Sequence, residues 1–237
     1  SEEELAEEYA AIGLTVDEVQ NNINCLMLQT GDDTILVDTG MGIAHESMGQ
    51  IFEGMAEHGI QPDDITKVNI THAHGDHVNG LLDADGELQF PNATLLFNLV
   101  EWNYWYAQGK ARGPAKELLE KIKPQKQGFF VNEEIVPGIM PLAAYGHTLG
   151  HTALLIQSEG EQMMHLVDTL HRLFQFSRPD WSISFDTQKT LAERTRADML
   201  ERAAEDGVLT MFYHLPFPGL GHVVEHEGAY RWEPIEL

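Results

Sequence analysis

The segment THAHGDH, residues 71–77, carries the strongest chemical signal in the chain. It offers four potential metal ligands within six residues, namely His72, His74, Asp76 and His77. Residues two apart in an extended segment point the same way, so His72 and His74 can reach one ion, and Gly75 lets the chain turn before the other two. No structural need places four such groups so close together, so the run predicts a metal site.

The spacing within this run favours a loop site over a helical one. The helical zinc-protease pattern requires histidines at positions i and i+4 with a glutamate beside the first, and His72 and Asp76 do not supply it. The run also follows an expected buried strand at 67–71, and loops at strand ends are where sites are commonly built.

Two further histidine clusters follow expected strands or glycine turns. YGHTLGH at 145–151 offers His147 and His151, and YHLPFPGLGH at 213–222 offers His214 and His222. His214 is favoured over His222 because it comes directly at a strand end, as the other candidates do. Asp168 follows the apolar residues of the run MMHLVD. Burying a carboxylate there costs free energy unless it is hydrogen-bonded or bound to a metal.

Alternating apolar segments and turn residues predict an α/β protein with a sheet core covered by helices. Strands are expected at 22–30, 34–38, 67–71, 93–98, 152–157, 162–168 and 208–213. One helix is expected from about Ile51, where apolar residues recur at helical spacing, up to Gly59. Further helices are expected near 99–108, 115–123 and 187–204. Nothing marks a domain boundary, so residues 1–237 are interpreted as one domain.

The composition excludes several functional classes. Fourteen Lys and Arg against 38 Asp and Glu give a formal charge of −24, which repels nucleic acids. No apolar stretch is long enough for a membrane helix, and the acidic start differs from a signal peptide. We therefore expect a soluble, cytoplasmic protein with no nucleic-acid or membrane partner; a periplasmic or secreted location requires that a leader has been removed.

The order of these motifs resembles the metallo-β-lactamase-fold hydrolase superfamily. The resemblance rests on HAHGDH at 72–77, GHT at 146–148, Asp168 and His214, with Asp38 in VDTG at 37–40 resembling a structural aspartate. FPGLGH at 217–222 and YRW at 230–232 are most similar to the branch that contains methyl parathion hydrolase and related lactonases. The fold implied is a four-layer αβ/βα sandwich of two mixed sheets covered by helices.

The resemblance also implies a ligand set and a mechanism. His72, His74 and His147 would hold one divalent ion, Asp76, His77 and His214 a second, and Asp168 would bridge them. Imidazole and carboxylate ligands suit zinc first, with manganese, cobalt or iron as alternatives. Metal-bound hydroxide would attack the substrate, and Asp76 would help to move the proton.

The preferred reaction is opening of a lactone or another carboxylic ester. The alternatives are an organophosphate triester, then a β-lactam, and finally thiol oxidation at a single iron, which would not use His214 as a ligand. The alternative that is not an enzyme is a binding protein that is stabilised by metal and has no catalytic turnover. No GxSxG elbow supports a covalent serine nucleophile.

Other residues are assigned supporting roles. His151 and His222 are expected to brace the metal loops by hydrogen bonds. Candidate contacts for a small-molecule substrate are Trp102, Trp105, Tyr106, His171 and Phe174, with core packing as the competing interpretation of the aromatic residues. The branch resemblance also implies a homodimer.

Overall fold

The computed structural model describes residues 1–18, 21–42 and 49–236. The chain divides into two compact units. Unit 1 comprises Ser1–Asn24, Ala144–His147 and Ala153–Leu237, and unit 2 comprises Cys25–Ala143 and Thr148–Thr152. The chain thus passes from one unit to the other between His147 and Thr148.

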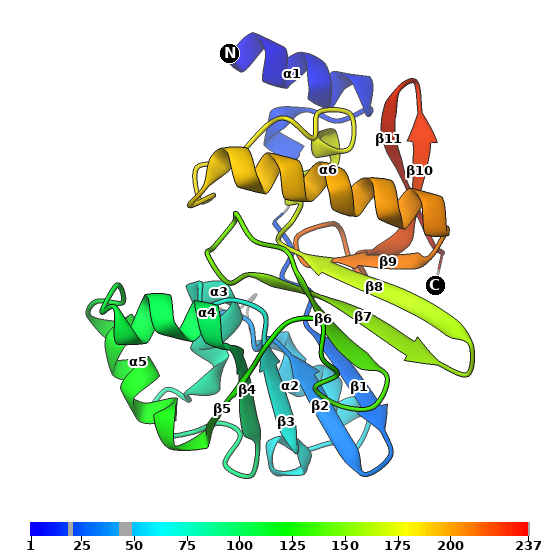
Figure 1. The fold of residues 1–237 in the computed structure, drawn as a ribbon. Coiled ribbons are helices and arrows are strands. Elements are labelled where there is room, and N and C mark those ends of the chain that lie inside the picture. Colours follow the sequence, from blue (N-terminus) through cyan, green and yellow to red (C-terminus); the bar gives the residue numbers. More distant parts are fainter. Residues whose placement is uncertain (19–20, 43–48, 237) are drawn as a thin grey trace. The chain divides into compact units, whose positions relative to one another are not determined.

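Unit 2 is built on a mixed sheet in which the first strand pair is antiparallel and the following pairs are parallel. Its strand order follows the sequence: β1 (Leu26–Thr30), β2 (Asp33–Val37), β3 (Lys67–Ile70), β4 (Thr94–Asn98) and β5 (Lys126–Phe129). Because β2, β3 and β4 are parallel, their carboxyl ends share one edge of the sheet, and the 71–77 segment begins there (Figure 1).

The helices of unit 2 lie in the connections between these strands. They are α2 (Gln50–Glu57), α3 (Gly75–Val78), α4 (Leu99–Trp102) and α5 (Pro114–Ile122), with a π-helix at Asn103–Ala107 and 3-10 turns at Pro62–Asp64, Asn79–Leu81 and Lys123–Gln125. Strand β6 (Ile139–Ala143) completes the unit's regular elements. A continuous apolar core includes Val68, Ile70, Leu95 and Phe97, so burial of β3 and β4 fixes the strand from which the histidine run departs.

Unit 1 also contains a mixed sheet, with β8 and β9 parallel and its other pairs antiparallel. Within this unit the strand order is β11-β10-β9-β8-β7. The bounds are β7 (Thr152–Ser158), β8 (Glu161–Val167), β9 (Leu209–Phe212), β10 (Leu220–His226) and β11 (Ala229–Pro234). The helical elements are α1 (Glu2–Ala11), α6 (Lys189–Asp206) and 3-10 turns at Val16–Glu18 and Leu173–Gln175.

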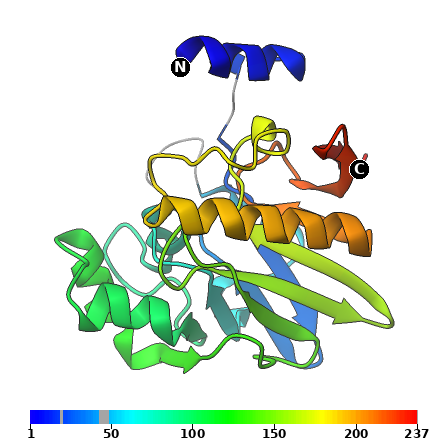
Figure 2. The same ribbon diagram turned by 45° about the horizontal axis from the view of Figure 1, so that its top comes forward.

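Helix α6 lies along the sheet of unit 1 in two views (Figures 1 and 2). It buries Ala192, Arg196, Leu200 and Ala203, whose spacing of three or four residues places them on one helical face. Gly207, in the left-handed conformation, ends the helix.

The α/β class with two mixed sheets and helices is confirmed, and several predicted boundaries are wrong. Strand β1 begins at Leu26 rather than at 22, and the helix expected at 99–108 becomes α4 followed by the π-helix. Strands β5, β6, β10 and β11 were not predicted. Pro141 interrupts the β6 pattern, and both faces of the β10–β11 hairpin carry polar residues, so neither shows clear alternation.

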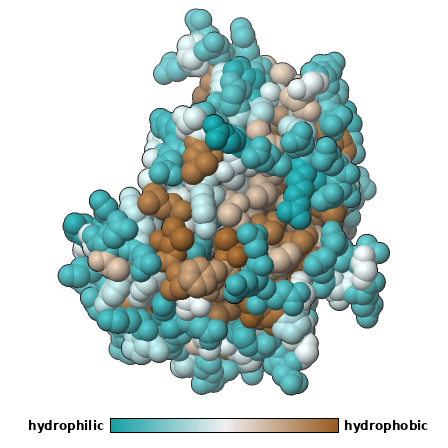
Figure 3. All heavy atoms as spheres, viewed as in Figure 1, coloured by the Kyte–Doolittle hydropathy of each residue, from teal (hydrophilic) through white to brown (hydrophobic). Residues whose placement is uncertain are grey.

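No helix in the described part of the chain is long and apolar enough to cross a bilayer. Hydrophilic side chains make up much of the face shown in Figure 3, in keeping with the excess of acidic residues.

Candidate metal centre

One group of candidate ligands lies in unit 2, where a buried aspartate fixes the 71–77 loop. Asp38 Oδ1 accepts a hydrogen bond from the Thr71 backbone N–H at 2.8 Å, and Oδ2 accepts one from the Thr71 hydroxyl at 2.7 Å. The same Oδ2 lies 2.8 Å from His77 Nδ1. Asp38 therefore joins both ends of the loop, in the structural role that the resemblance implies for it.

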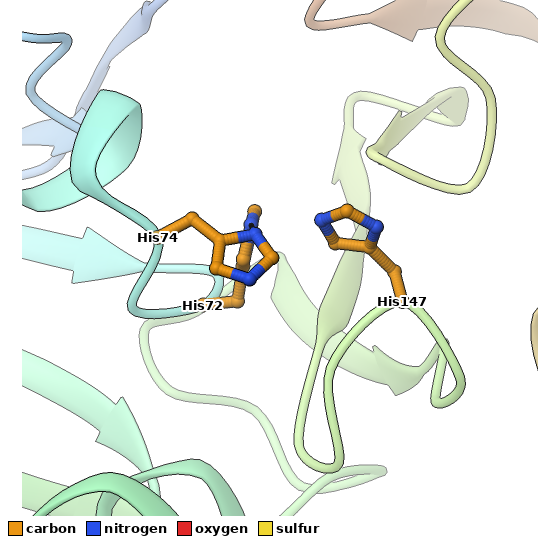
Figure 4. Close-up of side chains that lie close together, drawn as sticks. All are labelled: His72, His74 and His147. Carbon is orange, nitrogen blue, oxygen red and sulfur yellow. Dashed lines mark hydrogen bonds between the residues drawn. The ribbon is translucent and has the colours of Figure 1, made fainter. Parts of the chain in front are cut away.

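The histidine run brings its ligand atoms together. His72 Nε2 lies 3.0 Å from His74 Nδ1, and Figure 4 shows these two imidazoles side by side. The ring centroids of His72 and His77 are 4.0 Å apart, and Asp76 Oδ1 lies 3.8 Å from His77 Nε2. The third side chain in Figure 4, His147, belongs to unit 1 and is described with that unit.

Another group of candidate ligands, in unit 1, is centred on Asp168, which directly follows β8. Three imidazole nitrogens surround its Oδ2: His171 Nε2 at 3.1 Å, His147 Nε2 at 3.2 Å and His214 Nε2 at 3.3 Å. The preceding residue, Val167, has a φ of 51°, which is rare for a β-branched residue and of a kind that persists mainly at functional sites.

The hydrogen bonds at the opposite ring nitrogens define which atoms can bind a metal. His214 Nδ1 lies 2.8 Å from the carbonyl oxygen of Asn22, which only accepts, so Nδ1 carries the proton and Nε2 carries the lone pair. His147 Nδ1 lies 2.9 Å from Asp186 Oδ1 in the same way. Nitrogen lone pairs that face a carboxylate oxygen at these distances repel it unless a proton or a metal ion lies between them. The donor set therefore fits a metal ion.

Burial and neighbouring carboxylates shift the pKa values of these histidines in opposite directions. Burial alone would lower the pKa of His147, but Asp168 and Asp186 on its two sides raise it to about 9. Burial lowers the pKa of His171 to about 4, although Asp168 opposes the shift. Of these two, only His147 takes up a proton near neutral pH when no metal replaces it.

Asp186 and Arg196 support His147 and were not predicted from the sequence. Burial would raise the pKa of Asp186, but the hydrogen bond and charge of His147 lower it, with a smaller contribution from Arg196. The fully buried Arg196 guanidinium lies 3.4 Å from Asp186 Oδ2 and donates to the carbonyl oxygens of Thr169, Pro179 and Trp181. An arginine on the buried face of α6, where an apolar residue is the rule, was the only available signal.

The two histidines expected to brace the site lie in different places. The His151 ring is fully buried and lies 5.1 Å from the His72 ring in an edge-to-face arrangement. His222 lies in β10, in register with Glu233. His214, two residues after β9, belongs to the group around Asp168.

The aromatic residues predicted to contact substrate have different surroundings. Trp102 is a core residue that packs on Phe97 and Tyr106. Trp105 is half-buried, and its ring lies 5.9 Å from the His74 ring. Tyr106 donates a hydrogen bond to Glu120, and the buried Phe174 lies between the rings of Tyr9 and Trp181. Of these aromatic residues, Trp105 thus contacts the ring of a candidate ligand, His74.

Comparison with known proteins identifies the relatives of the chain. The N-acyl homoserine lactonase of Bacillus cereus is 26% identical over 226 residues, which cover 86% of this chain and 82% of that protein. The N-acyl homoserine lactonase AiiA of Bacillus thuringiensis subsp. kurstaki is 25% identical, over 89% of this chain and 84% of the relative.

The chain is also similar to solved structures of a lactonase and a hydrolase. AidC, a dizinc quorum-quenching lactonase in complex with a product N-hexnoyl-L-homoserine, matches with a TM-score of 0.92 and 28% identity, covering 100% of this chain and 87% of AidC. The hydrolase AbOPH of the beta lactamase superfamily matches with a TM-score of 0.89 and 27% identity, over 99% and 87% of the two chains.

The sequence model of one family matches residues 19–191, a range that includes the 71–77 run, His147 and Asp168. Because this match covers well over half of the chain and the two mixed sheets agree with the solved relatives, the chain belongs to the metallo-beta-lactamase superfamily of metal-dependent hydrolases.

Proposed function

We propose that the protein is a dinuclear metal-dependent lactonase that opens the ring of an N-acyl homoserine lactone or a similar carboxylic ester. His72, His74 and His147 would hold one ion, Asp76, His77 and His214 the other, and Asp168 would bridge them. The observation that carries the proposal is the cluster of three imidazole Nε2 atoms around Asp168 Oδ2, two of them with their proton placed on Nδ1. The dizinc centre stated for the lactonase AidC supports zinc and a pair of ions.

A pair of divalent ions supplies Lewis acidity, which activates water and polarises the substrate carbonyl. The chain provides the remaining functions. Asp38 and Asp186 orient His77 and His147 through their Nδ1 atoms, which fixes the tautomer that can bind a metal. Asp76, partly exposed beside His77, would accept the proton released from water and pass it to the leaving oxygen.

His171 and Trp105 are the proposed substrate contacts. The low pKa of His171 keeps the imidazole neutral at pH 7, so it would interact with a neutral lactone through a hydrogen bond rather than a charge. Trp105 would offer an apolar surface beside His74 for the acyl chain. Phe174, buried between two aromatic rings, would act by holding the segment that follows His171.

The test combines metal analysis with a substrate panel. We expect two zinc ions per chain and turnover of N-hexanoyl homoserine lactone that exceeds turnover of an organophosphate triester and of a β-lactam. His214→Ala should lose one ion and most activity, whereas His226→Ala, at an exposed histidine of β10, should lose neither. One iron per chain with thiol oxidation and no lactone opening would contradict the proposal, as would faster turnover of the phosphotriester.

A further inference from the structure

A second buried carboxylate, Glu101 on α4, lies outside the proposed ligand set. The residue is 1% exposed, and its two oxygens accept four hydrogen bonds. Oε1 accepts from the Ala73 backbone N–H at 3.0 Å and from the Trp105 indole Nε1 at 2.6 Å. Oε2 accepts from the Thr148 hydroxyl at 2.8 Å and from the Gly150 backbone N–H at 2.9 Å.

These donors come from the segments that carry proposed ligands. Ala73 lies between His72 and His74, and Thr148 directly follows His147 in the chain. The third donor, Trp105, contacts the His74 ring edge to face at 5.9 Å. One carboxylate therefore holds the backbone between two ligands, the residue after a third, and the ring packed against His74.

The geometry requires an acceptor with this capacity. Two backbone N–H groups and an indole N–H can only donate, and a carboxylate is the side chain whose two oxygens both accept. A glutamine has one accepting oxygen, so its amide group would face at least one donor. Burial raises the pKa of Glu101 and its four hydrogen bonds lower it, so loss of these bonds would favour a neutral side chain that accepts less well.

The surrounding chain is shaped to let the 148–150 segment approach α4 closely. A Cβ atom added to Gly150 would lie 2.3 Å from the backbone nitrogen of Glu101, so a larger residue would displace the segment. Asn98 caps α4 through Oδ1, which accepts from the Val100 N–H, and its Nδ2 donates to the Gly150 carbonyl at 2.9 Å. The end of β4, the first turn of α4 and this loop thus form one hydrogen-bonded group.

We propose that Glu101 is a positioning residue of the metal centre, which fixes the His72–His74 segment, the 148–150 segment and Trp105 through its four hydrogen bonds. This inference rests on the proposed function, because it concerns ligands of the proposed ions. The π-helix that follows α4 places Trp105 within reach of Glu101, and such local widening of a helix occurs frequently at functional sites.

The experiment compares Glu101→Gln with Glu120→Gln. Glu120 is an exposed glutamate of the same unit whose Oε2 accepts from the Tyr106 hydroxyl at 2.9 Å, so the control removes an acceptor away from the ligand segments. For each variant we would measure zinc affinity by competition with a chromogenic chelator, the visible spectrum of the cobalt-substituted protein, kcat and KM, and thermal unfolding without metal.

Glu101→Gln should bind zinc about 10- to 100-fold more weakly, shift the cobalt spectrum and lower kcat more than it raises KM. Glu120→Gln should match the wild type in all three. Thr148→Val and Trp105→Phe each remove one donor and should give smaller changes of the same kind; these two decide the question if Glu101→Gln does not fold.

The outcomes separate this inference from the proposed function. A wild-type protein that binds no metal overturns both. A wild-type protein with two ions and lactone turnover, together with a Glu101→Gln variant of unchanged zinc affinity and cobalt spectrum, overturns the role of Glu101 alone. Reduced stability without any change in the cobalt spectrum also overturns it, because a merely structural residue would behave in that way.

Discussion

The two ring nitrogens of His147 both face buried carboxylates, Asp168 at Nε2 and Asp186 at Nδ1. These two carboxylates hold its pKa near 9, above the ordinary value of 6.5. In the metal-free protein the charged imidazole therefore stabilises the fold. When a metal binds at Nε2, it takes the place of that proton.

The first prediction concerns pH. Because the folded pKa is raised, the stabilisation from His147 is complete below about pH 6.5 and is lost as pH rises through about 9. The melting temperature of the metal-free protein should therefore fall across this window, while that of the zinc-loaded protein should change much less. A metal-free melting temperature that stays constant or rises between pH 7 and 9 would show that the interpretation of His147 is wrong.

The second prediction concerns the carboxylate behind His147. Asp186→Asn keeps the shape of the side chain but removes the charge that Arg196 and His147 both face. We expect zinc affinity to fall about 10- to 100-fold, as is typical for partners of ligand histidines. Asp180→Asn, at an exposed carboxylate paired with Arg178, is the control and should bind zinc like the wild type. Equal affinities in a chelator competition would refute the role of Asp186.

Among individual residues, the proposed ligands could be identified from the sequence, and the residues that support them could not. His72, His74, Asp76 and His77 form a dense local pattern, so spacing alone identifies them. Asp186 is 39 residues from His147, and Glu101 is 47 residues from Thr148. A contact of that kind is created by the fold and leaves no local pattern in a single sequence.

Among the elements, those with continuous apolar burial were predictable. Strand β3 and the strand that precedes Asp168 both end in fully buried apolar residues, Ile70 and Val167. The hairpin of β10 and β11 has polar residues on both faces, so its pairing depends on neighbours that the sequence does not reveal. The predicted helix at 99–108 has the right position, but its widening into a π-helix depends on tertiary contacts.

The third prediction belongs to the loop after His147. Gly150→Ala would place a Cβ 2.3 Å from backbone at Glu101, which cannot move as a flexible side chain can. We expect a loss of about 1–3 kcal/mol in the free energy of unfolding, measured with urea. Gly54→Ala is the matched control, because it lies in α2 with nothing within 4 Å of the added atom.

The control should stabilise the protein by about 0.5–1 kcal/mol, the ordinary gain of alanine over glycine in a helix. If both variants have the same stability as the wild type, the close approach of the 148–150 segment to α4 does not exist in solution.

For the whole molecule, the net charge of −24 is the dominant property. The excess of carboxylates over Lys and Arg produces repulsion in the folded state, and dissolved salt screens this repulsion. The fourth prediction is that raising sodium chloride from low to physiological and then molar concentration increases stability by about 1 kcal/mol or more, which corresponds to about 2–4 °C in melting temperature for a chain of this size.

The salt measurement requires zinc at saturation, so that a change in metal binding is not mistaken for screening. As a further check, glucose or another uncharged solute at equal osmolarity should not reproduce the full increase. A melting temperature that falls with added sodium chloride would mean that attractive ion pairs, rather than repulsion, dominate the surface.

The division of unit 1 into three separate stretches of chain has a consequence for biosynthesis. Asn24, near the end of the first stretch, bonds through its backbone N–H to Tyr213 and through its side chain to the carbonyl of Leu215. A ribosome that has released the chain as far as Thr152 has delivered all of unit 2 but neither of those acceptors. The N-terminal segment therefore lacks these partners until Tyr213 and Leu215 have been translated.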